Sequence, residues 1–167
     1  QTVKADSKGY WEVNLKALET GGPYQLQIIG KENPISIKDI LIGDVWLCSG
    51  QSNMQWVVNN VTNAEVEKKN ANYSQIRTLN IPRRMELSPK DTISATWLVC
   101  SPENVGRFSG VAYFFAKKVY EETNIPIGII NSSWGGTIVE TWTSLEAANT
   151  LPQKRLDRYN KNEKLFP

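Results

Sequence analysis

The sequence has 167 residues, of which 40% are hydrophobic and 22% charged, with a formal net charge of +2. This composition is typical of a globular protein in water. The small net charge and the lack of a dense run of Lys and Arg argue against binding to nucleic acid, which needs a basic face. No apolar run approaches the roughly 20 residues that span a membrane. We therefore expect neither a nucleic acid nor a membrane as partner.

Histidine is absent from the sequence, and only two cysteines are present. Because His is the usual general base at neutral pH, a serine hydrolase without it must use a Lys base, be inactive, or be incomplete. Cys48 and Cys100 lie far apart and show neither a disulfide framework nor metal-ligand spacing. We expect no metal and no cofactor.

The first forty residues predict β-structure. Apolar and polar residues alternate along them, as on strands with one buried face. The runs that alternate or are extended in this way are 10–15, 24–29 and 35–42. Trp11, Val13 and Leu15 fall on one face of the first run, and Gly21-Gly22-Pro23 predicts a turn. We interpret residues 1–40 as the end of a β-rich, β-sandwich-like N-terminal module.

The character of the sequence changes near Gly43. Residues 44–49 form a short apolar run, typical of a parallel strand buried on both faces. Further strands are expected at 76–81, 92–99 and 125–131, and helical segments at 53–70 and 110–122. Ser109 is placed to cap the second helix. Strands that alternate with helices predict an α/β fold with a parallel sheet over 41–150, followed by a surface helix or linker at 151–167.

Ser52 follows the first apolar strand directly, in the segment Ser49-Gly50-Gln51-Ser52-Asn53-Met54. Ligands of open α/β sheets bind beyond the carboxyl ends of the strands, so this serine would lie where substrates arrive. Gly50 allows a tight turn. We expect the following helix to point N–H groups and partial positive charge at the site, which favours acyl transfer. A serine that only caps a helix is the alternative.

A second candidate loop, Asn131-Ser132-Ser133-Trp134-Gly135-Gly136-Thr137, also follows an apolar strand. Paired glycines let backbone N–H groups approach a ligand closely. An ordinary turn is the alternative reading of this loop. Two such loops at strand ends of one sheet reinforce each other as parts of one site.

These motifs resemble a known family. The block 42–54 is similar to the nucleophile block of the sialate O-acetylesterases, which are SGNH (GDSL-like) hydrolases, and 110–116 and 128–142 resemble the next two blocks. The resemblance extends from about Thr2 to Leu145. It implies a flavodoxin-like three-layer α/β fold with a parallel sheet, of which this chain would hold the N-terminal half. It also implies a serine esterase that removes O-acetyl groups from sialic acids through an acetyl-enzyme.

The resemblance also assigns site residues. Ser52 would be the nucleophile, and its own N–H one oxyanion donor. Gly135 would be the next donor, with Gly136 one position away and the register open. The other residues that match the family near its substrate cleft or supporting shell are Gln51, Asn53, Trp134, Thr137, Glu140 and Trp142.

Two family blocks have no counterpart here: a Gln-Gly-Glu-like strand end and the Asp/His segment that supplies the base. We therefore expect a fragment that is inactive alone and whose sheet is completed by the missing C-terminal half or a second chain. Activity of the chain alone would point to a lysine base, with Lys38, Lys68 or Lys69 as candidates. An acetylxylan or other sugar O-acetylesterase and a non-catalytic carbohydrate-binding fragment are the alternative functions. The family implies a secreted, periplasmic or lysosomal protein.

Overall fold

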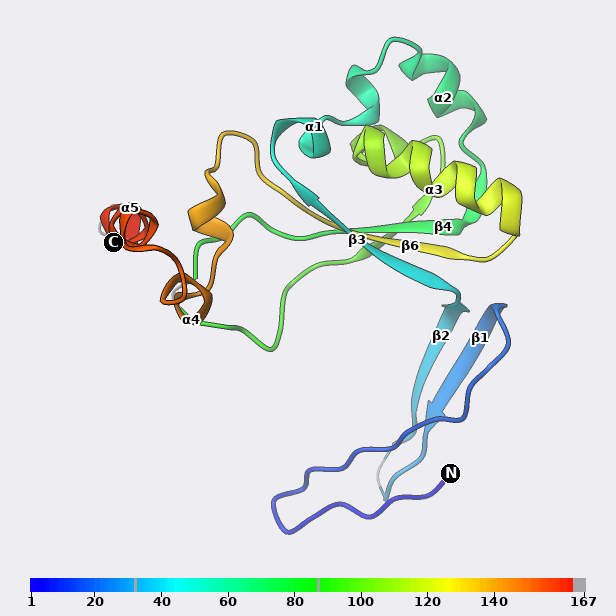
Figure 1. Cartoon of the computed structure of the whole chain (residues 1–167). Helices are drawn as coiled ribbons and strands as arrows, with labels where there is room; N and C mark the ends of the chain where they lie inside the picture. Colours follow the sequence, from blue (N-terminus) through cyan, green and yellow to red (C-terminus); the bar gives the residue numbers. More distant parts are fainter. Residues whose placement is uncertain (32, 87, 164–167) are drawn as a thin grey trace. The chain divides into compact units, whose positions relative to one another are not determined.

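The structure is a computed structural model that describes residues 1–31, 33–86 and 88–163 (Figure 1). The chain divides into two compact units, Gln1–Gly43 and Asp44–Pro167. The first is a small β unit, and the second contains a sheet of parallel and antiparallel strands and all the described helices.

The first unit contains an antiparallel pair of strands, β1 (Gly21–Ile28) and β2 (Ile35–Ile42). Two expectations for this unit are wrong. Residues 10–15 form no strand, and Trp11 and Leu15 are exposed. Alternation makes a strand only where a neighbouring strand takes up the backbone hydrogen bonds, and none of the described strands does so here. Gly21-Gly22-Pro23 opens β1 instead of forming a separate turn, at a point where the register is irregular.

The second unit contains a four-stranded sheet in the order β3-β6-β4-β5. Its strands are β3 (Asp44–Gly50), β4 (Tyr73–Asn80), β5 (Trp97–Cys100) and β6 (Ile127–Ser133). β3, β6 and β4 are mutually parallel, and β5 runs antiparallel to β4. The prediction of an α/β fold with a parallel sheet is confirmed. The strand expected at 92–99 is shorter than predicted.

Helices lie between β3 and β4 and between β5 and β6, and others follow β6. They are α1 (Ser52–Gln55), α2 (Ala64–Asn70), α3 (Gly110–Thr123), α4 (Leu145–Ala148) and α5 (Gln153–Glu163), with 3-10 turns η1 (Val58–Asn60), η2 (Val105–Arg107) and η3 (Val139–Trp142). The segment 53–70 is therefore broken into three pieces, because its β-branched and Asn residues favour helix poorly. Ser109 caps α3 as predicted, since its Oγ accepts the Ala112 N–H at 3.3 Å. None of the described helices is long and apolar enough to cross a membrane.

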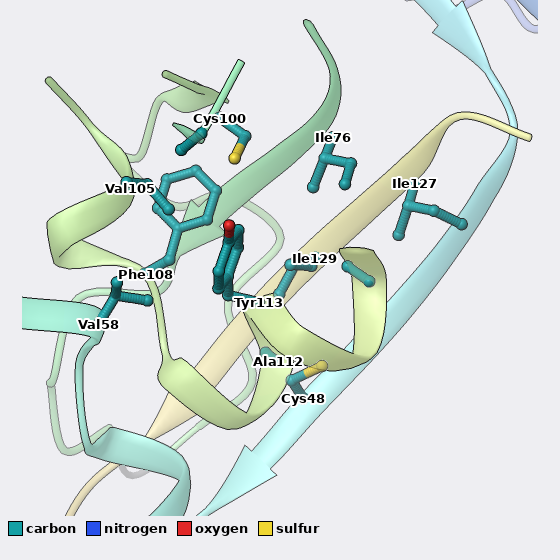
Figure 2. Packing of buried hydrophobic residues seen from close by; sticks show 12 residues of the cluster. Cys48, Val58, Ile76, Cys100, Val105, Phe108, Ala112, Tyr113, Ile127 and Ile129 are labelled. Carbon is teal, nitrogen blue, oxygen red and sulfur yellow. The ribbon is translucent and has the colours of Figure 1, made fainter. Parts of the chain in front are cut away.

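The core lies between α3 and one face of the sheet. Figure 1 shows α2 and α3 over this face, and Figure 2 shows the side chains that pack there. Tyr113 and Phe108 are the largest fully buried ones, against Ile76, Ile127 and Ile129. Burial of such side chains is the main favourable term in folding, so this contact holds α3 on the sheet.

The two cysteines contribute to the same core and are free thiols. Burial raises the pKa of both, that of Cys100 to about 12. Thiolate is the reactive form, so neither cysteine has the character of a nucleophile.

The opposite face of the sheet is open among the described residues. Val45 and Leu47 of β3 are 62% and 69% exposed, so the expectation that this strand is buried on both faces is wrong. Side chains alternate along a strand, and Trp46 points instead toward α3, where its ring meets that of Phe115 at 5.0 Å. β3 is also an edge strand, because it pairs only with β6 within the described part of the chain.

Candidate active site

Ser52 is the first residue of α1 and follows β3 after a turn at Gly50, whose φ of 151° favours glycine. Its side chain is exposed, and its Oγ forms no hydrogen bond with any described residue. The residue at the N-cap is Gln51, which makes no side-chain cap bond either. Helix capping therefore does not explain Ser52.

α1 itself has only four residues. The partial charge at a helix end is the sum over aligned peptide dipoles, so a single turn supplies little of it. The expected helix is present after the turn, but it contributes less of the expected partial positive charge than a longer helix would. What remains at the turn are individual N–H groups.

The loop of residues 131–137, here called the glycine loop, lies beside the turn that leads from β3 to Ser52. Gly50 and Ser133 are paired at the carboxyl ends of β3 and β6, and the Trp134 N–H donates to the Gly50 carbonyl at 3.0 Å. A Cβ atom on Gly135 would lie 3.1 Å from Oγ of Ser52 and 3.4 Å from its Cα. The fold thus brings together the two loops that the sequence singled out.

Gly136 lies differently. Its φ is +81°, in the left-handed region, and a Cβ placed on it would meet nothing within 4 Å. Of the two glycines, Gly135 is the one packed against Ser52. Gly136 provides the backbone conformation of the turn, which an L side chain rarely adopts.

Two glutamine side chains bridge the loops. Nε2 of Gln51 donates to the Thr137 carbonyl, and Oε1 of Gln55 accepts the N–H of Gly135. Gln51, a predicted residue of the substrate cleft, thus contacts the loop that contains Gly135. Gln55 was not predicted at all. Its spacing of four residues from Gln51, which places both on one side of a helical turn, is the signal that could have identified it.

Three of the predicted cleft residues form a hydrogen-bonded chain within the glycine loop. Oγ1 of Thr137 donates to the Trp134 carbonyl at 2.7 Å, and Nε1 of Trp142 donates to Oγ1 of Thr137 at 2.8 Å. These contacts shape the loop around Gly135. Glu140 is buried, with 5% of its surface exposed, and lies in the turn η3 that follows.

Two shallow pockets are described near these elements. One, of about 470 Å³, adjoins the nucleophile turn and is lined by Asn53, Trp56, Val61, Gly110, Val111 and Phe114. The other, of about 400 Å³, is lined by Val139, Glu140, Lys154 and Arg155. Asn53 is thus the predicted cleft residue that lines a pocket beside Ser52.

The described residues place no base against Ser52. No side-chain nitrogen or carboxylate among them is hydrogen-bonded to its Oγ. Of the three candidate lysines, Lys68 is paired with Glu65 at 2.6 Å on α2. The arrangement places a serine hydroxyl and backbone N–H groups together at the carboxyl ends of β3 and β6.

Comparison with known proteins agrees with this geometry. The family described as carbohydrate esterase, sialic acid-specific acetylesterase, matches residues 42–164. The chain belongs to this family. The resemblance inferred from the motif blocks is confirmed, and the matched region includes both loops of the site.

Curated members of the sialic acid-specific acetylesterase family are similar over most of the chain. The sialate O-acetylesterases of Pongo abelii and Homo sapiens are each 39% identical over 156 residues, which is 86% of this chain and 30% of the relative. That of Mus musculus is 34% identical over 168 residues, 92% of this chain and 31% of the relative. The chain spans about 30% of the length of these relatives.

A solved structure of the same kind shares the fold. A carbohydrate acetylesterase from Xanthomonas citri superposes with a TM-score of 0.84 at 37% identity, covering 92% of this chain and 35% of that one. The α/β fold of this sialic acid-specific acetylesterase family member is thereby confirmed by comparison as well as by its own strand order.

Proposed function

We propose that this chain is the nucleophile-bearing part of a carbohydrate esterase that removes O-acetyl groups from sialic acids. One observation carries the proposal: the unengaged Oγ of Ser52 lies against Gly135 where two parallel strands end. Ligands of open α/β sheets bind at this edge. Membership of the sialic acid-specific acetylesterase family supports the substrate class.

In the proposed reaction, Oγ of Ser52 attacks the acetyl carbonyl carbon, and the carbonyl oxygen becomes an oxyanion. The N–H groups of Ser52 and Gly135 would donate to that oxyanion, which needs them more than the neutral carbonyl does. Collapse releases the sugar hydroxyl and leaves an acetyl-enzyme, which water hydrolyses to acetate. A base must take the Ser52 proton, and we propose that it belongs to the part of the protein that corresponds to the rest of the relatives' length.

The first test is Ser52→Ala in the complete polypeptide, measured as acetate release from an O-acetylated sialic acid. We expect a loss of about 10⁶-fold, the size seen when the nucleophile of a serine hydrolase is removed. Ser88→Ala, an exposed serine elsewhere in the unit, is the matched control. Unchanged hydrolysis in Ser52→Ala would disprove the nucleophile assignment. If the unmodified protein also binds the sugar but releases no acetate, a carbohydrate-binding role would be favoured.

The second test uses residues 1–167 alone. We expect no hydrolysis above background, because an unactivated serine hydroxyl is a weak nucleophile at pH 7. A fluorophosphonate should label Ser52 in the complete polypeptide and not in this chain. Robust hydrolysis by the homogeneous chain would place the base within it, with Lys38, Lys68 and Lys69 as the candidates to substitute.

A broader substrate range is the second candidate function. The Xanthomonas citri relative is described as a carbohydrate acetylesterase without mention of sialic acid. Comparing kcat/KM for O-acetylated sialic acid and for acetylxylan distinguishes the two.

We further propose an exported or lysosomal location, which fractionation of cells that express the protein would test.

A further inference from the structure

The N–H of Gly135 is already engaged in this structure. It donates to Oε1 of Gln55, the last residue of α1. A backbone amide has one hydrogen to donate. The donor that the proposed function assigns to the oxyanion is therefore occupied by a side chain of the protein itself.

Gln55 reaches Gly135 from the same side as the nucleophile. A Cβ atom on Gly135 would lie 2.9 Å from Oε1 of Gln55 and 3.1 Å from Oγ of Ser52. The carboxamide oxygen is also chemically close to an ester carbonyl oxygen: both are sp² and partly negative. Gln55 thus presents to Gly135 the kind of atom that a bound acetyl group would present.

The glycine loop does not depend on Gln55 for its position. Gln51 holds the carbonyl of Thr137, and the N–H of Trp134 donates to the Gly50 carbonyl at 3.0 Å. These two contacts fix the loop on either side of Gly135. The bond from Gly135 to Gln55 can open while the loop stays attached to the nucleophile turn.

We propose that Gln55 is a removable cap on the oxyanion donor Gly135. The proposal rests on the proposed function. Without substrate, the cap satisfies a half-buried N–H that would otherwise lack an acceptor. The acetyl oxygen displaces it, and the negative charge that develops in the transition state makes the exchange favourable, since a charged acceptor binds an N–H about twice as strongly as a neutral one. In this proposal Gln55 acts through Gly135, as a positioning residue.

Two substitutions in the complete polypeptide separate a cap from a simple anchor. Gln55→Glu keeps the acceptor and adds a negative charge, so a cap would be harder to displace; we expect kcat/KM to fall by about 10²-fold, as when an oxyanion donor is lost. Gln55→Met has similar length and no acceptor. We expect its kcat/KM to rise by up to about tenfold, which corresponds to the loss of a neutral hydrogen bond that competes with the substrate. Gln25→Glu and Gln25→Met, at an exposed glutamine of β1, are the matched controls.

A second readout does not depend on activity. In protein labelled with ¹⁵N-glycine, the Gly135 amide proton, assigned by its loss in Gly135→Ala, should shift upfield and exchange faster in Gln55→Met. An unchanged Gly135 signal overturns the proposal. If Gln55→Met folds poorly, Gln55→Ala takes its place.

The kinetic outcomes decide as follows. A loss in Gln55→Met with normal activity in Gln55→Glu shows an anchor and overturns the cap, as do equal effects in both variants. Hydrolysis that persists in Ser52→Ala overturns the proposed function and the cap together. Hydrolysis that requires Ser52 but is insensitive to Gln55→Glu overturns the cap alone.

Discussion

The space that a side chain at Gly135 would need is already taken. A Cβ atom there would approach Gln55 to 2.9 Å and the Ser52 hydroxyl to 3.1 Å, closer than ordinary packing distances. In the proposed reaction, the loop backbone must come this near for the Gly135 N–H to donate to the oxygen of the carbonyl group whose carbon Ser52 attacks. The requirement for glycine at this position is therefore steric.

Gly135→Ala should accordingly lower kcat by about 10²-fold or more, the cost of displacing one oxyanion donor. Gly30→Ala, where a Cβ meets nothing within 4 Å, is the matched control and should leave the rate unchanged. Both variants would be compared for acetate release by the complete polypeptide. A Gly135→Ala enzyme with full activity would contradict the placement of this N–H in the oxyanion site.

At this scale the sequence located the two loops of the candidate site, and it did not predict the side chains that connect them. Ser52 and Gly135 follow apolar strands, and that position alone places them at the carboxyl ends of the strands of a parallel sheet. Gln55 could not be found in this way, because the partner of its carboxamide is 80 residues away in the chain and depends on how β3 and β6 pair. Gln51 was named among the cleft residues, but its contact with Thr137 could not be predicted for the same reason.

Among the elements, α2 and α3 are joined by a buried carboxylate. Oε2 of Glu67 accepts hydrogen bonds from Tyr113 and Lys117, each at 3.0 Å, and its Oε1 accepts one from Asn63 at 3.0 Å. Burial opposes ionisation of Glu67, but the bonds from Lys117 and Tyr113 and the charge of Lys117 outweigh it, so its pKa is lowered. The pKa of Tyr113 is raised by burial and by its bond to Glu67.

This contact should contribute pH-dependent stability. Because the pKa of Glu67 is lower in the folded chain than the ordinary 4.5, the contribution is present above about pH 4.5 and is lost as the pH falls through the folded value. At pH 7, Glu67→Gln should cost about 1–3 kcal/mol of unfolding free energy. Glu65→Gln, an exposed pair on the same helix, should cost little. Denaturant unfolding at several pH values measures both, and a Glu67→Gln deficit that stays constant down to pH 3 would contradict the assignment.

Comparison of the predicted and observed elements shows what an apolar pattern in the sequence can predict. The strand 44–49 and helix 110–122 are found nearly as predicted, because both carry a strong apolar pattern and a turn or cap signal. Residues 10–15 alternate just as clearly and form no strand. Alternation reports which face a strand would bury, and it says nothing about whether a partner strand is there to pair with it.

For the whole molecule, the open face of the sheet is the dominant feature. The side chains of Val45 and Trp97 both lie over Gly128, where a Cβ atom would be 3.3 Å from each of them. Val45, Leu47 and Trp97 are all substantially exposed. A continuous apolar surface of this kind is normally covered in soluble proteins. The relatives are about three times as long as this chain, so we expect this face and the β3 edge to be covered by the remaining part of such a polypeptide.

Residues 1–167 in isolation should therefore self-associate. We expect size-exclusion chromatography to show species larger than a monomer, and Leu47→Lys to shift them toward monomer because it places a charge on the open face. Val66→Lys, at an exposed valine of α2 on the opposite side of the sheet, should have no such effect. A sharp thermal transition from a well-behaved monomer would show instead that the chain is stable with this face open.

Among the described strands, β3 lies at the edge of the sheet, and the turn that follows it leads to Ser52. A further strand that paired with this edge would contact the same strand that leads to Ser52, the proposed nucleophile. If Ser52 is the nucleophile, as proposed, completion of the sheet and alignment of Ser52 would occur in the same folding step. Esterase activity would then appear only when the exposed apolar face is also covered. The rate at which esterase activity returns during refolding would therefore measure the rate at which the sheet is completed.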